Sequence, residues 1–376
     1  MKILIAMDGY FPGQKFGGPP VSTDNFCSLM CEHECYIVTK NHDLDEKTPY
    51  PGIVPGEWVE RENCKVTYFD DSEYRVQNFE KIIIEIQPDA IYLQSLFDDC
   101  VLFFLMLAKK YNIKVLLAPR GQLCAGAFKK KYKKIPYILI LRLFGYIKHI
   151  YCQSTSDEET EAIHKYLQIP RERILFLTNV PSIPSQKDFQ YPEKESGSAK
   201  FVFLSRIHPK KNLLKAVNLL KDIQGNVIFD VYGSLEDEAY WEKCQKEAKN
   251  YPDSFQMNYR GLISHDQVHE TFSNYDAFIF PSFSENYGHV IVEALISGCP
   301  AIISDQTPWE DLEENEAGWV YALENEAGFR AAIQTIVDVD SNRFKESAKK
   351  YAQKKLNIEG LKKNYKNAFE QIVNKC

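Results

Sequence analysis

Short apolar runs that alternate with longer helical patterns constrain the fold of this chain more than any other feature. Runs such as KILIAM, at residues 2–7, are almost continuously apolar, which is typical of parallel strands buried on both faces. Amphipathic segments such as NFEKIIIEIQ, at residues 78–87, lie between these runs. The alternation starts again after residue 199. The sequence therefore predicts two α/β domains, each built on a mostly parallel sheet.

The segment between the two halves, PSIPSQKDFQYPEKESGSAK, is rich in Pro, Ser and charged residues, as connectors are. We predict four parts: a first domain over 1–185, a linker over 186–199, a second domain over 200–355, and a C-terminal helix over 356–376 that crosses back to the first domain. Two doubly wound, Rossmann-like domains of this kind face each other across a cleft, with ligands beyond the carboxyl ends of the strands.

Composition and missing motifs exclude several classes of function. The net charge of −7 argues against a general nucleic-acid binder. Neither a G-x-G-x-x-G nor a G-x-x-x-x-G-K-[ST] pattern occurs, which disfavours dinucleotide dehydrogenases and P-loop enzymes. The chain has no apolar run long enough to span a bilayer, and Met1 leads directly into a strand-like run. We expect a cytoplasmic protein.

The most informative segment is YDAFIFPSFSENYGHVIVEALISGCPAIIS, residues 275–304. It indicates a strand, a turn with Glu285 and Gly288, and a helix that contains Glu293. A helix N-terminus attracts phosphate oxygens, whereas ionised carboxylates accept hydrogen bonds from sugar hydroxyls. Taken alone, Glu285 is better explained as a solvated residue and Glu293 as a capping or surface residue.

The second segment is SRIHPKKN, residues 205–212, in which Arg206 ends a predicted strand and Lys211 precedes a helix. An arginine and a lysine so placed can converge on one anion. Their charge would stabilise a departing nucleoside diphosphate. Taken alone, this segment also fits a solvated basic turn.

Together the two segments resemble the R-x(4)-K and E-x(7)-E motifs of the family 4 glycosyltransferases, which are retaining enzymes with the GT-B fold. The resemblance implies that Arg206 and Lys211 bind the donor diphosphate and that Glu285 binds hydroxyls of the transferred sugar. It implies that Glu293 holds the ribose. It further implies a donor site that includes Gly17, Gly18, Gly233, Leu262, Asn286, Tyr287, Gly288 and His289.

One position departs from the family pattern. Many members have a histidine after a strand in the middle of the first domain, where this sequence has Arg120 and Gly121 in VLLAPRGQL. The PRG variant resembles a subgroup found in surface-polysaccharide assembly. Arg120 is expected to contact donor phosphate or acceptor, since a guanidinium cannot act as a neutral base. Asp8, Ser95 and Asp98, in other strand-end loops, are candidates for the acceptor side.

We expect neither a metal nor another cofactor. Asp43–Asp45 and Asp338–Asp340 match the D-x-D pattern of GT-A enzymes, but they lie in a polar loop and at a helix end, not at strand ends beside a donor. His265 and His269 share a predicted helical face. The sequence SHDQ is better explained by a capping box from Ser264 to Gln267, because a zinc site needs more ligands.

The stretch FKKKYKKIPYILILRLFGYIKH, residues 128–149, places lysines before large apolar side chains. Such a stretch suits peripheral contact with the inner face of an anionic membrane, or a lipid-diphosphate acceptor. It suits an amphipathic core helix with a basic exposed face equally well.

The function that these features predict is transfer of a hexose-type sugar from a UDP- or GDP-sugar to a hydroxyl of a glycan or lipid-linked acceptor, in polysaccharide or glycan assembly. Retention at the anomeric carbon is implied by the resemblance. Two alternatives stay open: a GT-B nucleotide-sugar epimerase, and a non-catalytic protein that binds nucleotide sugars.

Overall fold

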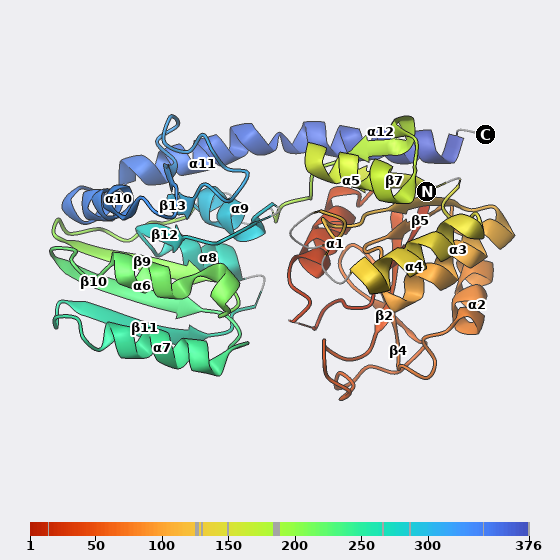
Figure 1. The fold of residues 1–376 in the computed structure, drawn as a ribbon, viewed down its shortest axis with the longest axis horizontal. Helices are drawn as coiled ribbons and strands as arrows, with labels where there is room; N and C mark the ends of the chain where they lie inside the picture. The colour runs from red at the N-terminus through yellow and green to blue at the C-terminus, as the bar shows by residue number, and fades with distance from the viewer. Residues whose placement is uncertain are drawn as a thin grey trace. The chain divides into compact units, whose positions relative to one another are not determined.

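The computed structural model describes residues 1–13, 15–124, 128, 131–148, 150–182, 189–264, 267–285, 287–340 and 342–374, without the side chains of Lys131 and Lys133. The chain forms two compact units, unit 1 (Met1–Val180 with Ile358–Cys376) and unit 2 (Pro181–Asn357) (Figure 1). The predicted linker counts with unit 2, since Lys194 Nζ donates to the carbonyls of Val337 and Val339.

The sheet of unit 1 has the strand order β3-β4-β2-β1-β5-β6-β7-β8. Every neighbouring pair is parallel except β3 and β4. The strands are β1 (Lys2–Ala6), β2 (Glu34–Lys40), β3 (Trp58–Glu60), β4 (Lys65–Phe69), β5 (Ala90–Leu93), β6 (Lys114–Leu117), β7 (Tyr151–Ser154) and β8 (Ile174–Phe176).

Both faces of this sheet are buried, because alternate residues of a strand point to opposite sides. Leu4 and Ala6 of β1 belong to one hydrophobic cluster, and Ile3 and Ile5 belong to another. The helices of unit 1 are α1 (Gly18–Leu29), α2 (Val76–Ile86), α3 (Asp99–Tyr111), α4 (Lys131–Leu143), α5 (Asp157–Leu167), the short η1 (Arg171–Arg173) and α12 (Ile358–Asn374).

Helix α12 completes the core of unit 1, although it is the last element of the chain. Tyr365 and Phe369 are buried in the cluster that contains Ile3 and Ile5. The Tyr365 hydroxyl donates to the carbonyl of Thr178, and Gln153 Nε2 donates to the same hydroxyl. Folding of unit 1 therefore requires both ends of the chain.

The sheet of unit 2 is entirely parallel in the order β11-β10-β9-β12-β13-β14. Counted within the unit, this is the 3-2-1-4-5-6 order of a Rossmann sheet, which changes direction between β9 and β12. The strands are β9 (Ser198–Leu204), β10 (Asn226–Tyr232), β11 (Phe255–Gly261), β12 (Ala277–Phe280), β13 (Ala301–Ser304) and β14 (Gly318–Tyr321).

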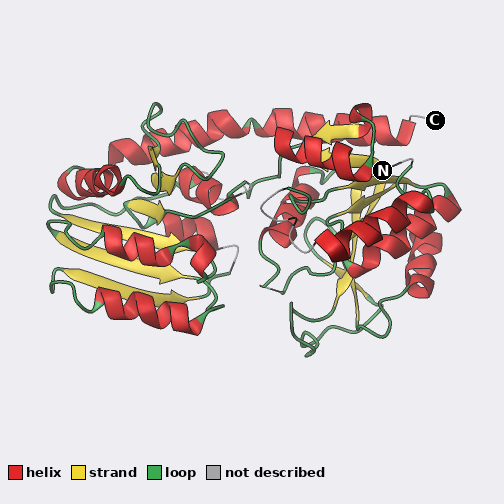
Figure 2. Ribbon diagram, in the orientation of Figure 1, coloured by secondary structure: helices red, strands yellow, loops and turns green. Residues whose placement is uncertain are grey.

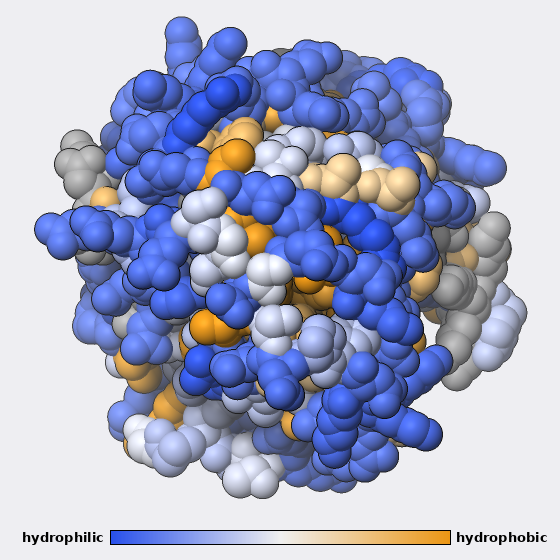
Figure 3. Space-filling model, turned by 90° about the vertical axis from the view of Figure 1, so that its left-hand side faces the viewer, coloured by the Kyte–Doolittle hydropathy of each residue, from blue (hydrophilic) through white to orange (hydrophobic). Residues whose placement is uncertain are grey.

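Helices of unit 2 form two groups whose members contact one another, α6–α7–α10 and α8–α9–α11 (Figure 2). The helices are the short η2 (Pro209–Lys211), α6 (Leu213–Leu219), α7 (Glu238–Ala248), α8 (Val268–Ser273), α9 (His289–Ile296), α10 (Glu326–Asp338) and α11 (Asn342–Leu356). On the face drawn in Figure 3, hydrophilic side chains predominate and hydrophobic ones occur in small groups.

The described part of the chain contains no helix that combines the length and the apolar character needed to cross a membrane.

Candidate functional site

The loops with the two motifs meet at the change of strand order in unit 2. Arg206 and Lys211 follow β9, and Glu285 and Gly288 follow β12, the neighbouring strand. Two hydrogen bonds join the loops. The Phe283 N–H donates to the Lys210 carbonyl at 3.1 Å, and Asn212 Nδ2 donates to the Pro281 carbonyl at 2.9 Å. Ligands of open α/β sheets bind at this position.

At the centre of the site, the Lys211 ammonium donates to Glu285 Oε1 at 2.5 Å. The Ser282 hydroxyl donates to the same oxygen at 2.9 Å. Only 14% of the Lys211 side chain and 12% of the Glu285 side chain are exposed, so water screens this ion pair weakly. Burial lowers the pKa of Lys211, and the charge of Glu285 acts in the opposite direction.

Arg206 lies close enough for its charge to help lower the pKa of Lys211. Its Nη1 donates to both carboxylate oxygens of Glu236, at 2.9 and 3.1 Å, and its side chain is 43% exposed. Lys211 and Arg206, the two residues predicted to bind the diphosphate, are therefore each paired with a carboxylate. A bound diphosphate would compete with these carboxylates for the two cations.

The loop that follows β12 leads into the N-terminus of α9, and Gly288 shapes this start of the helix. This residue has φ of 77° and precedes the first helical residue, His289. A Cβ atom on Gly288 would lie 2.9 Å from Ile291 Cδ1. Trp309 Nε1 donates to the carbonyl of Tyr287 at 2.7 Å, which fixes the approach to the helix. The first N–H groups of such a helix suit phosphate or sugar oxygens. Asn286 lies outside the described residues.

Glu293 lies on α9 and is only 6% exposed. Burial raises the pKa of its carboxyl group from 4.5 to about 7. Within the described ranges, no hydrogen bond or ion pair joins this carboxyl group to another side chain. A buried acceptor without a partner is suited to a ligand hydroxyl.

Two further residues predicted for the sugar-donor site, Gly233 and Leu262, follow β10 and β11. Gly233 has φ of 137°, and a Cβ atom there would lie 1.8 Å from the Ser205 carbonyl oxygen. Only glycine therefore permits the ends of β9 and β10 to approach so closely. Leu262 directly follows β11 and is 55% exposed.

The three acceptor-side candidates of unit 1 lie together at the change of strand order between β1 and β5. The Asp8 N–H donates to Asp98 Oδ2 at 2.9 Å, and the Asp99 N–H donates to Asp8 Oδ2 at 2.9 Å. Ser95 Oγ accepts hydrogen bonds from Gln122 Nε2 at 2.9 Å and from the Phe97 N–H at 3.2 Å. Burial, together with the charge of Asp98, raises the pKa of Asp8 to about 6.

Arg120 is held by other residues of unit 1. Its guanidinium donates to Ser22 Oγ at 3.1 Å and also to Asn179 Oδ1 and Gln94 Oε1. In this arrangement it joins helix α1 to the segments that follow β5 and β8.

The Gly17–Gly18 pair forms the start of α1. Gly17, with φ of 72°, is the N-cap residue of this helix, and Gly18 is its first residue. No atom lies within 4 Å of a Cβ built on Gly17, so space is available beside its backbone.

The aspartates Asp43 and Asp338 of the two D-x-D triplets have local structural roles. Asp43 accepts hydrogen bonds from the N–H groups of Lys15 and Leu44, and Asp338 ends α10. Among the residues described, no group of three or more His, Cys, Asp or Glu side chains could hold a metal ion.

The predicted capping box is wrong. Helix α8 begins at Val268 with Gln267 as N-cap, and Ser264 Oγ donates to the Gln267 side chain at Oε1. The reason is a turn in which the Gln267 N–H donates to the Ser264 carbonyl. His269 is buried between the hydroxyls of Ser182 and Ser297, at 2.9 Å from each. His265 lies outside the described residues.

Three residues of the site were not predicted from the sequence. Ser282 orients the Glu285 carboxylate, Glu236 pairs with Arg206, and Trp309 fixes the Tyr287 carbonyl. The position of Ser282 at the end of a buried strand was a usable signal. Glu236 and Trp309 come from loops that no motif connects to the site.

The two doubly wound units define the GT-B fold of glycosyltransferases. Over 99% of this chain and 100% of the other, the structure is similar to that of HepE from Anabaena, solved in complex with UDP and glucose, with a TM-score of 0.71 and 13% sequence identity. Residues 184–355 match the family model "Glycosyl transferases group 1".

Two curated relatives are glycosyltransferases by name. A processive diacylglycerol alpha-glucosyltransferase of Acholeplasma laidlawii is 24% identical over 44% of this chain and 53% of its own. An O-antigen chain mannosyltransferase B of Escherichia coli is 25% identical over 41% of this chain and 41% of its own. The chain thus spans about half the length of these relatives or less.

Proposed function

We propose that the protein is a retaining glycosyltransferase that moves a sugar from a UDP- or GDP-sugar, bound in unit 2, to a hydroxyl of a glycan or lipid-linked acceptor. The observation that carries the proposal is the Lys211–Glu285 pair beside the N-terminus of α9. It combines cations for a diphosphate with a carboxylate for sugar hydroxyls. The complex of HepE with UDP and glucose supports a nucleotide-sugar donor.

In the proposed reaction, Lys211 and Arg206 bind the donor diphosphate and stabilise the negative charge that develops as it leaves. Glu285 accepts hydrogen bonds from hydroxyls of the transferred sugar, and Glu293 accepts them from the ribose. The bond from the anomeric carbon to the phosphate oxygen breaks, and the bond to the acceptor oxygen forms on the same face of the sugar. The departing phosphate oxygen takes the acceptor proton, so atoms and charge balance.

The proposal includes independence of divalent metals, because Arg206 and Lys211 supply the positive charge that a cation supplies in other transferases. It also includes a role in assembly of surface glycans and a cytoplasmic location. The name of the E. coli relative, an O-antigen chain mannosyltransferase, supports the role in assembly of surface glycans.

The test starts with a thermal-shift screen of UDP- and GDP-sugars, since a ligand of the folded state raises its melting temperature. The stabilising donor is then incubated with candidate acceptors, and the anomeric configuration of the product is read by NMR. A product with the donor's configuration is expected, and an inverted product would contradict retention. A donor converted to its epimer without acceptor would instead establish the epimerase. Donor binding without turnover of any acceptor would favour the non-catalytic protein.

A further inference from the structure

The C-terminal end of α4 in unit 1 combines exposed apolar side chains with a pocket of basic ones. Ile135, Leu139 and Leu143 are spaced four residues apart, so they share one face of the helix. Their exposed fractions rise along the helix from 39% to 47% and 82%. Phe144, the next residue, is 59% exposed. This apolar tip faces solvent.

The tip is held in place by local contacts. The Gly145 N–H donates to the Arg142 carbonyl at 2.9 Å, and the Tyr146 N–H donates to the Leu141 carbonyl at 2.9 Å. Gly145 has φ of 65°, which lets the chain turn sharply after the helix. Lys109 Nζ donates to the Phe144 carbonyl at 2.9 Å. The exposed side chains therefore project from an ordered turn.

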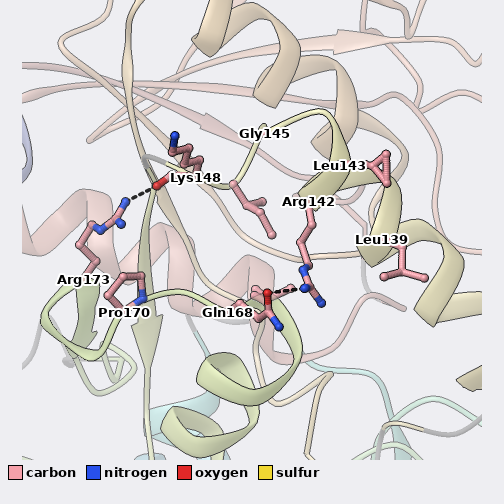
Figure 4. A pocket seen from close by; sticks show the side chains of 10 residues that line it. Leu139, Arg142, Leu143, Gly145, Lys148, Gln168, Pro170 and Arg173 are labelled. Carbon is pink, nitrogen blue, oxygen red and sulfur yellow. Dashed lines mark hydrogen bonds between the residues drawn. The ribbon is translucent and has the colours of Figure 1, made fainter.

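Beside the tip lies a pocket of about 440 Å³. The residues that line it are Leu139, Arg142, Leu143, Gly145, Ile147, Lys148, Leu167, Gln168, Pro170 and Arg173. Three of them are basic, and none of these lining residues is acidic. Figure 4 shows how two arginines are positioned. Arg142 donates to Gln168 Oε1, and Arg173 donates to the Lys148 carbonyl.

These two hydrogen bonds leave the charges of Arg142 and Arg173 without an anionic partner among the described residues. Arg171, two positions away, differs because it forms an ion pair with Glu161 at 2.5 Å. A pocket with three cations and no carboxylate in its lining is complementary to a phosphate group. Apolar side chains next to such a pocket suit the acyl boundary below a layer of phosphates.

Of the lysine run at residues 129–134, only Lys134 has a described side chain. Lys129 and Lys130 lie outside the described residues, and the side chains of Lys131 and Lys133 are not described. Lys134 Nζ lies over the rings of Phe97 and Phe128, at 4.6 and 5.5 Å from their centroids. Burial lowers the pKa of Lys134. The described structure thus favours the opposite end of the helix as the contact.

We propose that the end of α4 docks on an anionic lipid bilayer, with Leu143 and Phe144 inserted among the lipids and with Arg142, Lys148 and Arg173 around a lipid phosphate. This inference does not depend on the proposed donor chemistry. Each basic residue near an anionic surface strengthens partitioning about fivefold, or about 1 kcal/mol. Three together overcome the repulsion expected from the net charge of −7.

The test is co-sedimentation of the full chain with vesicles of phosphatidylcholine alone, or of equal parts phosphatidylglycerol and phosphatidylcholine. The wild-type protein is expected to sediment only with the anionic vesicles and to be released by high salt, which screens the charges. The double variant Arg142→Gln/Arg173→Gln is expected to bind about 25-fold more weakly. Leu143→Ser/Phe144→Ser is expected to lose at least about tenfold.

Two matched controls isolate the surface. Arg171→Gln removes a neighbouring charge outside the pocket, and Phe176→Ser removes an apolar side chain of unit 1 that is 56% exposed. Both should sediment like the wild type, and circular dichroism should show all variants folded.

Three outcomes would overturn the proposal. They are a wild-type protein that ignores anionic vesicles at low salt, binding that survives both double variants, and a dimer that Leu143→Ser/Phe144→Ser dissociates while vesicles stay unbound. The third result would assign the surface to a second copy of the chain. Donor binding, measured separately, stays unaffected in each case.

Discussion

The Lys211 ammonium and the Glu285 carboxylate form a hydrogen-bonded ion pair of 2.5 Å between the loops that follow β9 and β12. The two residues are 74 positions apart in the sequence. Without donor, the pair neutralises two charges that are largely shielded from water. Under the proposed function, each partner would have a better-matched ligand when donor is bound, the diphosphate for Lys211 and the sugar hydroxyls for Glu285.

Glu285→Gln is expected to separate catalysis from nucleotide binding. The amide cannot hold the sugar as the carboxylate does, so the transfer rate should fall about a hundredfold. Affinity for UDP or GDP should stay equal or increase, because Lys211 no longer shares its charge. Calorimetry and turnover assays measure the two effects. Glu326→Gln, which removes an exposed glutamate paired with Lys215, should change neither. Parallel losses of binding and rate in Glu285→Gln would be inconsistent with this role.

Glu293 should make stability depend on pH. Burial raises its pKa from 4.5 to about 7, so between these values the folded protein holds the proton more tightly than the unfolded chain. The free energy of unfolding therefore falls as the pH rises through this window, by up to about 3 kcal/mol. Glu293→Gln has no carboxyl group at this position, so its free energy of unfolding lacks this dependence on pH. Urea unfolding should show the variant more stable than the wild type above pH 7 and equal to it below 4.5.

The same residue should make nucleotide binding depend on pH. Ribose hydroxyls donate hydrogen bonds more strongly to a carboxylate than to a carboxylic acid. Wild-type affinity for UDP or GDP should therefore increase as the pH rises through about 7. Glu293→Gln serves as the control, since it retains only the titration of the nucleotide itself. Identical pH profiles for the two proteins would remove Glu293 from the nucleotide site.

Gly288→Ala should weaken donor binding beyond its cost in stability. A Cβ at φ of 77° costs about 1–2 kcal/mol, and here it also meets Ile291 at 2.9 Å. Gly52→Ala is the matched control, with φ of 76° and no atom within 4 Å of the new Cβ. Thermal unfolding should show a loss in both variants, larger in Gly288→Ala. Only Gly288→Ala should lose affinity for UDP or GDP, and equal affinities would refute a role for this helix N-terminus.

Transfer activity should persist in excess EDTA, because the cations of the site are side chains. The measurement is the initial rate with and without chelator, using the donor identified by thermal shift. A loss of rate that manganese restores would show that a divalent metal takes part.

The central strands were predictable from the sequence, whereas the edge strands were not. Strands such as β1, β9 and β12 are buried on both faces and are therefore nearly continuous in apolar residues. The edge strands β3 and β8 have three residues each, none of them buried. They lack both the length and the apolar pattern that distinguish a strand from a loop.

The candidate donor site was partly predictable from the sequence. Motif spacing indicated that Arg206, Lys211, Glu285 and Glu293 serve one site, but it contained no signal for the partners of these residues. Glu236 lies 30 positions from Arg206, and its contact depends on how two strands end. The same holds for Arg120, whose three partners come from different segments of unit 1. Such contacts follow from the tertiary fold.

Calorimetric titration of UDP and GDP into the wild-type protein, Lys211→Ala and Arg206→Ala tests the central claim most directly, that unit 2 binds the donor diphosphate through these cations. Each lost contact should cost about 1.5–3 kcal/mol, which is about a 10- to 150-fold increase in Kd. Lys221→Ala, which removes an exposed lysine of the same unit, should bind like the wild type. Unchanged affinity in both Lys211→Ala and Arg206→Ala, with the wild type binding the nucleotide, would contradict the account.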